Sequence, residues 1–108
     1  MNILITGASS RLGQQIIAKL VSNHQLRLLD STIPEIKHEN LEFIQGSMID
    51  PNIADKAMRN IDALIHTGEP PQNLPQAPLQ REQILLDLAT RGTHVLLKAA
   101  VEAGVKRF

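Results

Sequence analysis

The sequence contains no cysteine, tryptophan or tyrosine, and its only aromatic residues are Phe43 and Phe108. Without cysteine, neither disulfides nor thiolate chemistry are available. The near absence of aromatic rings argues against a surface on which nucleic-acid bases stack. The 11 basic residues are balanced by 11 acidic ones, so no positive charge is left over to attract nucleic acid or an anionic membrane. We therefore expect neither as a partner.

Long apolar runs are also missing. None approaches the roughly 18 residues that span a bilayer, and the N-terminus lacks the basic region and cleavage site of a secretory signal, so we expect a cytoplasmic protein. The chain of 108 residues suffices for one small domain, and we expect no second one. We assign no metal, because the histidines share no metal-ligand spacing; they are His24, His38, His66 and His94.

What the chain does contain is an apolar run, residues 2–6, that breaks into a Gly/Ser-rich turn. The run has no polar alternation, which is typical of a buried strand. Gly7 opens the turn, and apolar residues then recur at helical spacing over Leu12 to Val21. A strand that leads through such a turn into a helix directs the free N–H groups and the positive dipole end of the helix at one place, where a phosphate binds. A tight turn without a ligand remains the alternative.

The letters TGASSRLG resemble the glycine turn of the extended short-chain dehydrogenase/reductase superfamily, the branch of epimerases, dehydratases and reductases. In its pattern T-G-x-x-G-x-x-G, Thr6 and the two outer glycines match, and Ser10 stands where the middle glycine belongs. That glycine lets the main chain approach a pyrophosphate. Serine is small and can itself donate to a phosphate, so we expect weaker binding. The resemblance implies that these residues hold the pyrophosphate: Gly7, Ser9, Ser10, Arg11, Leu12 and Gly13.

Asp30 ends a second predicted strand, Gln25 to Leu29, close to the offset of about 20 residues after the glycine turn where an acid binds the adenosine ribose. A carboxylate there accepts hydrogen bonds from the ribose diol and repels a 2′-phosphate, so we expect NAD rather than NADP. Arg11 instead favours NADP, because a basic residue in the turn can pair with a 2′-phosphate. A solvated acid at a strand end is the alternative for Asp30.

The segment that follows a third predicted strand, Leu41 to Gln45, resembles the family's G-D-L-x-D segment. Ser47 replaces the first acid, so the resemblance leaves Met48 as an apolar shelf for the adenine. We interpret Asp50 as the cap of a short helix over residues 53–59, because proline follows it.

A fourth predicted strand, Ile61 to His66, leads into Thr67 and Gly68. In relatives this small-residue turn lies against the dinucleotide, although Glu69 is unusual there. We interpret His66 as a packed strand-end residue without a catalytic role. Pro70 to Pro78 is rich in proline and is predicted to be a rigid connection.

A second match to the family is RGTHVLLKAAVEAGVKRF, residues 91–108, which is similar to its G-T-x-x-L-L-x-A-A-x-x-x-G-V-K-R-F signature. We predict one long helix over Leu79 to Ala103, with Gly92 packed tightly on a neighbour. Gly104 is the expected C-cap, and Val105 to Phe108 begins a fifth strand.

The resemblance implies an α/β, Rossmann-like, doubly wound parallel sheet in order 3-2-1-4 plus the start of strand five, with residues 1–108 as the N-terminal part of an NAD(P)-binding domain. The family's catalytic serine and Tyr-x-x-x-Lys pair have no counterpart, so we expect this chain alone not to catalyse the family reaction. We interpret it as truncated, or as a homo-oligomer that covers the edge of strand four.

Two functions remain open. The first is the cofactor-binding part of an oxidoreductase or epimerase/dehydratase that acts on a hydroxyl-bearing, sugar-like substrate. The second is a non-catalytic nucleotide-sensing or scaffolding protein on the same fold, which the missing middle glycine and Ser47 favour. A methyltransferase that binds S-adenosylmethionine shares the layout, but residues 5 and 6 lack the acid that usually precedes its turn.

Overall fold

The computed structural model describes residues 1–32, 36–67, 76–86 and 91–108. Within these residues a parallel sheet has the order β3-β2-β1-β4, as the sequence predicts. Its strands are β1 (Asn2–Thr6), β2 (Gln25–Asp30), β3 (Leu41–Gln45) and β4 (Ala63–His66). The helices are α1 (Arg11–Leu20), α2 (Pro51–Ala57), α3 (Pro78–Leu86) and α4 (Thr93–Ala103).

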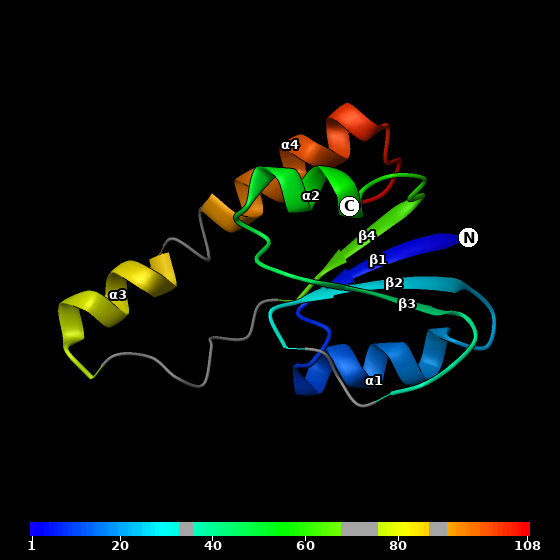
Figure 1. Ribbon diagram of the computed structural model, residues 1–108, viewed down its shortest axis with the longest axis horizontal. Helices are drawn as coiled ribbons and strands as arrows, with labels where there is room; N and C mark the ends of the chain where they lie inside the picture. The colour runs from blue at the N-terminus through cyan, green and yellow to red at the C-terminus, as the bar shows by residue number, and fades with distance from the viewer. Residues whose placement is uncertain (33–35, 68–75, 87–90) are drawn as a thin grey trace.

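The sheet is covered on both faces, by α1 on one side and by α2 and α4 on the other (Figure 1). Side chains of β1 therefore alternate between two cores: Ile3 and Ile5 pack with Ile17 of α1, whereas Leu4 packs with Leu96 of α4. Because both faces are buried at β1 and β4, the interiors of these two strands are apolar without alternation. This arrangement is the doubly wound architecture.

The helix termini follow the local sequence. The Asp50 carboxylate accepts a hydrogen bond from the N–H of Asn52 at 3.0 Å, which confirms it as a cap, and Pro51 occupies the first turn. The helix thus begins at Pro51 rather than at residue 53. Gly104 adopts a left-handed conformation, with φ of 78°, and caps α4, as predicted.

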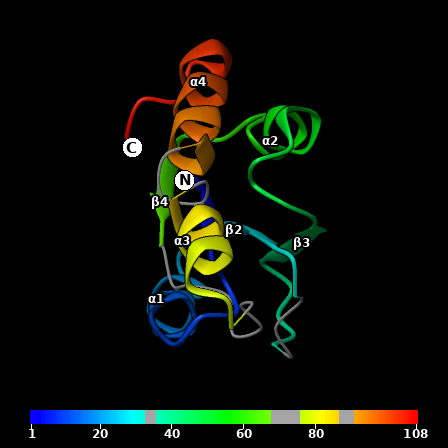
Figure 2. The same ribbon diagram turned by 90° about the vertical axis from the view of Figure 1, so that its left-hand side faces the viewer.

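Of the single helix predicted over Leu79 to Ala103, the structure describes two parts, α3 and α4, and residues 87–90 between them lie outside the described residues. Gly92 directly precedes α4 and has helical dihedral angles, with φ of −59° and ψ of −48°. Its predicted close packing is confirmed, since a Cβ atom would lie 3.3 Å from Cε of Met48 and 3.4 Å from Cγ2 of Ile49. Helix α3 stands apart from both helical layers, beyond the carboxyl ends of the strands (Figures 1 and 2).

The end of the chain lies beside β4, where the sequence predicts the start of a fifth strand. It forms an isolated parallel bridge between Ala63 and Arg107, and the N–H of Leu64 donates to the Arg107 carbonyl at 2.9 Å. In the described residues this contact is a single bridge and not a strand.

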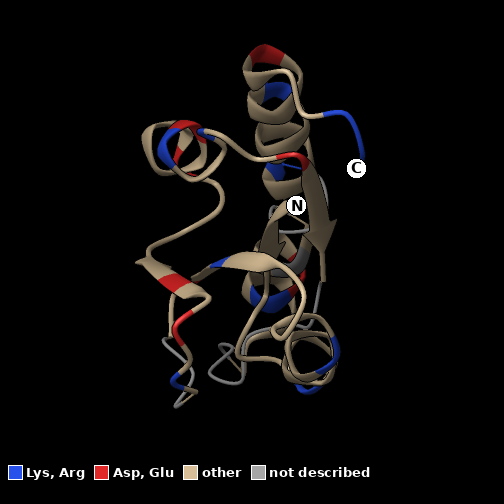
Figure 3. Ribbon diagram, turned by 90° about the vertical axis from the view of Figure 1, so that its right-hand side faces the viewer, with Lys and Arg blue, Asp and Glu red and all other residues tan. Residues whose placement is uncertain are grey.

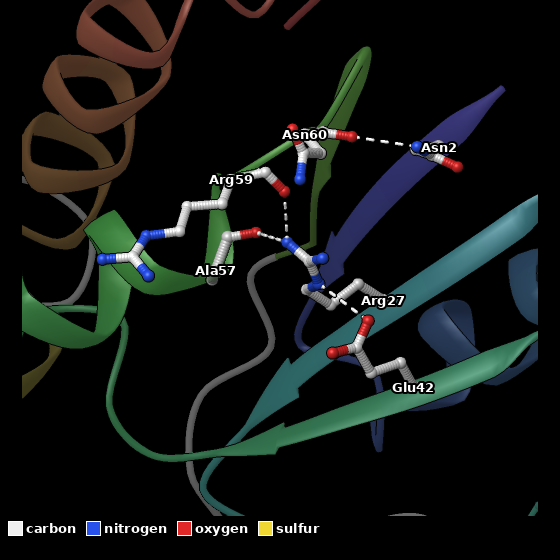
Figure 4. Close-up of polar contacts among 6 residues, drawn as sticks. All are labelled: Asn2, Arg27, Glu42, Ala57, Arg59 and Asn60. Atoms are coloured by element: carbon white, nitrogen blue, oxygen red, sulfur yellow. Dashed lines mark hydrogen bonds and ion pairs between the residues drawn. The ribbon is translucent and has the colours of Figure 1, made fainter.

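Arg27 is the one charged side chain within β2 before its terminal Asp30, and it ties the sheet to the end of α2 (Figure 4). Its Nη1 donates to the carbonyls of Ala57 at 2.7 Å and Arg59 at 2.6 Å, and its Nε pairs with Glu42 at 3.1 Å. Carbonyls at a helix end lack partners, and hydrogen bonds to charged groups contribute about 1.5–3 kcal/mol. The pair with Glu42 contributes at most about 1 kcal/mol, because Glu42 is 63% exposed. The carbonyl contacts are therefore the main role of Arg27.

Acidic and basic positions are interspersed over the molecule, as α2 illustrates with adjacent Asp55 and Lys56 (Figure 3). The central strand β1 carries neither sign. In the part of the chain that the structure describes, no helix combines the length and apolar character needed to cross a bilayer.

Candidate functional site

The turn between β1 and α1 is shaped by two glycines. Gly7 has φ of 67°, and a Cβ atom there would overlap the carbonyl oxygen and the hydroxyl of Thr67. A Cβ atom on Gly13 would overlap the carbonyl oxygen of Gly7. Both positions therefore require glycine for the close approach of backbone segments, and the amino end of α1 is held against the carboxyl end of β1.

Among the residues described, the start of α1 has two amides with a partner and two without one. The N–H of Ser10 donates to the carbonyl of Gly7 at 3.0 Å, and the N–H of Gly13 donates to the Ser10 hydroxyl oxygen at 3.0 Å. Within the described residues the amides of Arg11 and Leu12 have no acceptor, as expected for the first turn of a helix. These N–H groups and the positive end of the helix dipole can bind an anion.

Ser10, which replaces the middle glycine of the motif, is the N-cap of α1. Because its oxygen accepts from Gly13, its hydroxyl proton remains able to donate elsewhere. The hydroxyl oxygen of Thr67 lies 3.5 Å away, at the limit of a hydrogen bond. The Ser10 hydroxyl thus occupies the Gly13 amide, which is then not free to bind a ligand, and it offers its own proton as a side-chain donor.

Asp30 reaches the glycine turn from the neighbouring strand. The parallel register pairs Thr6 with Leu29, so Asp30 lies next to the residues that follow β1. Its Oδ2 accepts from the amide of Ser9 at 2.9 Å and from the Ser9 hydroxyl at 2.5 Å. Its Oδ1 accepts from the N–H of Ser31 at 2.7 Å. The structure therefore brings the predicted ribose-binding acid and the predicted pyrophosphate turn together.

The bond between Ser9 and Asp30 is a feature that sequence reasoning missed, because it assigned Ser9 to the pyrophosphate alone. The parallel register of β1 and β2 is the signal that places the two residues side by side. Neither residue type by itself predicts the partner.

The other predicted site residues lie in different surroundings. Thr67 is buried, and its hydroxyl donates to the carbonyl of Thr6 at 2.6 Å, which secures the ends of β1 and β4. Met48 is half-buried and packs against the core formed with α2 and α4. The side chain of Leu12 is 51% exposed. Gly68 lies outside the described residues.

His66 joins three elements near this turn. Its Nδ1 lies 2.6 Å from the hydroxyl of Thr6, and its Nε2 lies 3.4 Å from the hydroxyl of Thr93 at the start of α4. Burial lowers the pKa of His66 from its ordinary value of 6.5, since desolvation disfavours the charged ring. The described residues contain no cluster of histidine, aspartate or glutamate able to hold a metal ion.

The lowered pKa of His66 predicts a dependence of stability on pH. Between the folded pKa and 6.5, the unfolded chain binds more protons than the folded one, so the free energy of unfolding rises with pH. The contribution of the neutral His66 ring to the free energy of unfolding is fully present above pH 6.5 and is lost as the pH falls through the folded pKa. Urea titrations from about pH 5 to about pH 8 measure this slope, which we expect His66→Asn to reduce and the exposed-residue control His94→Asn to preserve. An equal slope in His66→Asn would contradict the assignment.

Comparison with known proteins places the chain in a family. Residues 7–108 match a family model described as NAD(P)H-binding, so the chain belongs to this NAD(P)H-binding family. It is 30% identical over 107 residues to the protein y4nG of Sinorhizobium fredii (strain NBRC 101917 / NGR234), a match that covers 97% of this chain and 26% of that protein.

Solved structures agree with this assignment. A short-chain dehydrogenase/reductase superfamily protein from Agrobacterium tumefaciens with bound NAD superposes with a TM-score of 0.78 at 29% identity, over 100% of this chain and 31% of that one. Uronate dehydrogenase from the same organism gives a TM-score of 0.76 at 25% identity, over 95% of this chain and 37% of that one.

The predicted fold and the resemblance to the short-chain dehydrogenase/reductase and epimerase/dehydratase group are thereby confirmed. The chain is an NAD(P)-binding domain of that group. It spans 26% of the length of the curated relative.

Proposed function

We propose that this chain binds NAD at the carboxyl ends of β1 and β2, with the pyrophosphate on the glycine turn and the adenosine ribose on Asp30. The observation that carries the proposal is the meeting of the Asp30 carboxylate with the start of α1, through its two hydrogen bonds from Ser9. An acid and a set of free amides at adjacent points match the ribose and the diphosphate of an adenosine diphosphate, which are neighbouring parts of that molecule.

The turn offers the pyrophosphate hydrogen-bond donors. The two glycines allow Thr67, the turn and the start of α1 to approach one another closely, which holds these donors in place. The amides of Arg11 and Leu12 are without acceptors in the described residues, and the Ser10 hydroxyl can supply a third donor. Since Ser10 already occupies the Gly13 amide, we expect weaker binding than with a glycine at this position.

The preference for NAD depends on Asp30. Its Oδ1 accepts one short bond, from the N–H of Ser31 at 2.7 Å. Its contacts with the Ser31 hydroxyl at 3.4 Å and the Thr32 amide at 3.5 Å are long, so a ribose hydroxyl can replace them. A 2′-phosphate at the same place would meet a like charge. In this proposal the adenine lies against Met48, and Thr67 and Gly68 flank the middle of the dinucleotide. Arg11 is exposed at the turn and is the residue that would favour NADP.

For the whole protein we propose hydride transfer between the nicotinamide and a hydroxyl-bearing, sugar-like substrate, in an oxidoreductase or epimerase/dehydratase. The similarity to uronate dehydrogenase supports this substrate class. The second candidate is a nucleotide sensor without catalysis, and the specific observation in its favour is the Ser10 side chain at the amino end of α1. Formation of NADH by the full protein in the presence of uronates or related sugars supports the first candidate, and NAD binding without turnover supports the second.

Calorimetric titration with NAD and NADP tests the cofactor assignment. We expect NAD to bind more tightly than NADP, and Asp30→Ala to weaken NAD binding by about tenfold or more, as the loss of a charge-assisted hydrogen bond predicts. NADP binding should not weaken in that variant. Asp55→Ala, which removes an exposed acid on α2, is the matched control for net charge. Unchanged NAD binding in Asp30→Ala would remove the ribose assignment.

A further inference from the structure

We infer that Ser9 determines the cofactor preference by positioning the Asp30 carboxylate, an inference that rests on the proposed function of Asp30. The amide and the hydroxyl of Ser9 both donate to one oxygen, Oδ2, at 2.9 Å and 2.5 Å. The other oxygen, Oδ1, accepts from the N–H of Ser31 at 2.7 Å. Ser9 is therefore a positioning residue for the acid.

The carboxylate is fixed by these contacts in one orientation. A carboxylate oxygen has two in-plane lone pairs, and Ser9 occupies both lone pairs of Oδ2. The other contacts of Oδ1 are long, from the Ser31 hydroxyl at 3.4 Å and the Thr32 amide at 3.5 Å, so a ribose hydroxyl would replace them at Oδ1. A ribose hydroxyl would find a carboxylate that is already oriented, so binding need not include the loss of its rotational freedom.

The hydroxyl of Ser9 carries a single proton, and that proton is directed at Asp30. It is therefore not free to donate to a pyrophosphate, a task left to the Arg11 and Leu12 amides and to Ser10. The backbone of Ser9 is also fixed by a side chain, because Nε2 of Gln14 donates to the Ser9 carbonyl at 2.9 Å. Ser9 thus acts on the ribose end of the ligand and not on its phosphates.

Two classes of variant separate these roles. Ser9→Ala and Ser9→Gly remove the hydroxyl but retain the amide donor, whereas Ser9→Thr retains both. Ser22→Ala, at an exposed serine after α1, is the control. Each variant is titrated with NAD and with NADP by calorimetry, and its melting temperature is recorded, so that a loss of fold is distinguished from a loss of preference.

We expect Ser9→Ala to lower the ratio of NAD to NADP affinity by about tenfold or more, in the range of one hydrogen bond to a charged group, with Ser9→Gly behaving alike. Ser9→Thr and Ser22→Ala should keep the wild-type ratio. In an Asp30→Ala background Ser9→Ala should leave the ratio unchanged, because the two residues act as one unit.

An equal loss of affinity for both dinucleotides would instead assign Ser9 to the pyrophosphate and overturn the inference. An unchanged ratio, or tighter NAD binding in Ser9→Ala, would overturn it as well. If the wild-type protein shows no saturable NAD binding, the proposed function itself fails, and that result is distinct from a wild-type protein that binds NAD with no effect of Ser9.

Discussion

Replacement of Gly7 by alanine is expected to destabilise the fold by about 3 kcal/mol or more and to abolish dinucleotide binding. Two costs add at this position. The backbone has φ of 67°, a left-handed conformation that costs an L residue about 1–2 kcal/mol. The new methyl group would also overlap the carbonyl and the hydroxyl of Thr67, and overpacking of this kind costs about 1–3 kcal/mol.

Gly104→Ala separates the two costs. Gly104 has a similar φ of 78°, but a Cβ atom at this position would have no heavy atom within 4 Å outside its immediate chain neighbours. It should therefore show only the backbone cost of about 1–2 kcal/mol. Urea unfolding followed by circular dichroism gives both values. If the two variants lose equal stability, the contact with Thr67 does not restrict this turn.

Replacement of Gly13 by alanine has the second large expected effect, and the sign of the change in the free energy of unfolding is informative. Within a helix, alanine is favoured over glycine by about 1 kcal/mol, so propensity alone predicts stabilisation. The methyl group would, however, overlap the carbonyl oxygen of Gly7, which cannot move without opening the turn. We expect a net destabilisation of about 2 kcal/mol and a loss of NAD binding, because the start of α1 would shift away from β1.

Gly92→Ala is the matched control for this variant. Its Cβ atom would meet the flexible side chain of Met48 at 3.3 Å and a methyl group of Ile49 at 3.4 Å, not a backbone carbonyl. We expect a change in the free energy of unfolding within about 1 kcal/mol of zero, measured by the same urea titration. A stabilised Gly13→Ala protein that binds NAD normally would contradict the close approach of α1 to the turn.

The sequence by itself determined the layered architecture and the place of the candidate site. The uninterrupted apolar run over residues 2–6 indicated a strand buried on both faces, and the sheet order that the resemblance to the family implied is the observed order. Local patterns also identified the cap at Asp50 and the left-handed Gly104. The first strand and the two caps could be predicted because each depends on residues adjacent in the chain: an apolar period, a side chain that caps its own helix, or a glycine at a helix end.

Only the tertiary structure decided which polar groups meet. The bond of Ser9 to Asp30 and the contact of His66 with Thr6 join residues from different strands, and they depend on register, which residue types do not encode. Short-range patterns thus located the turn and its acid, and the parallel alignment of β1 with β2 determined how they are connected.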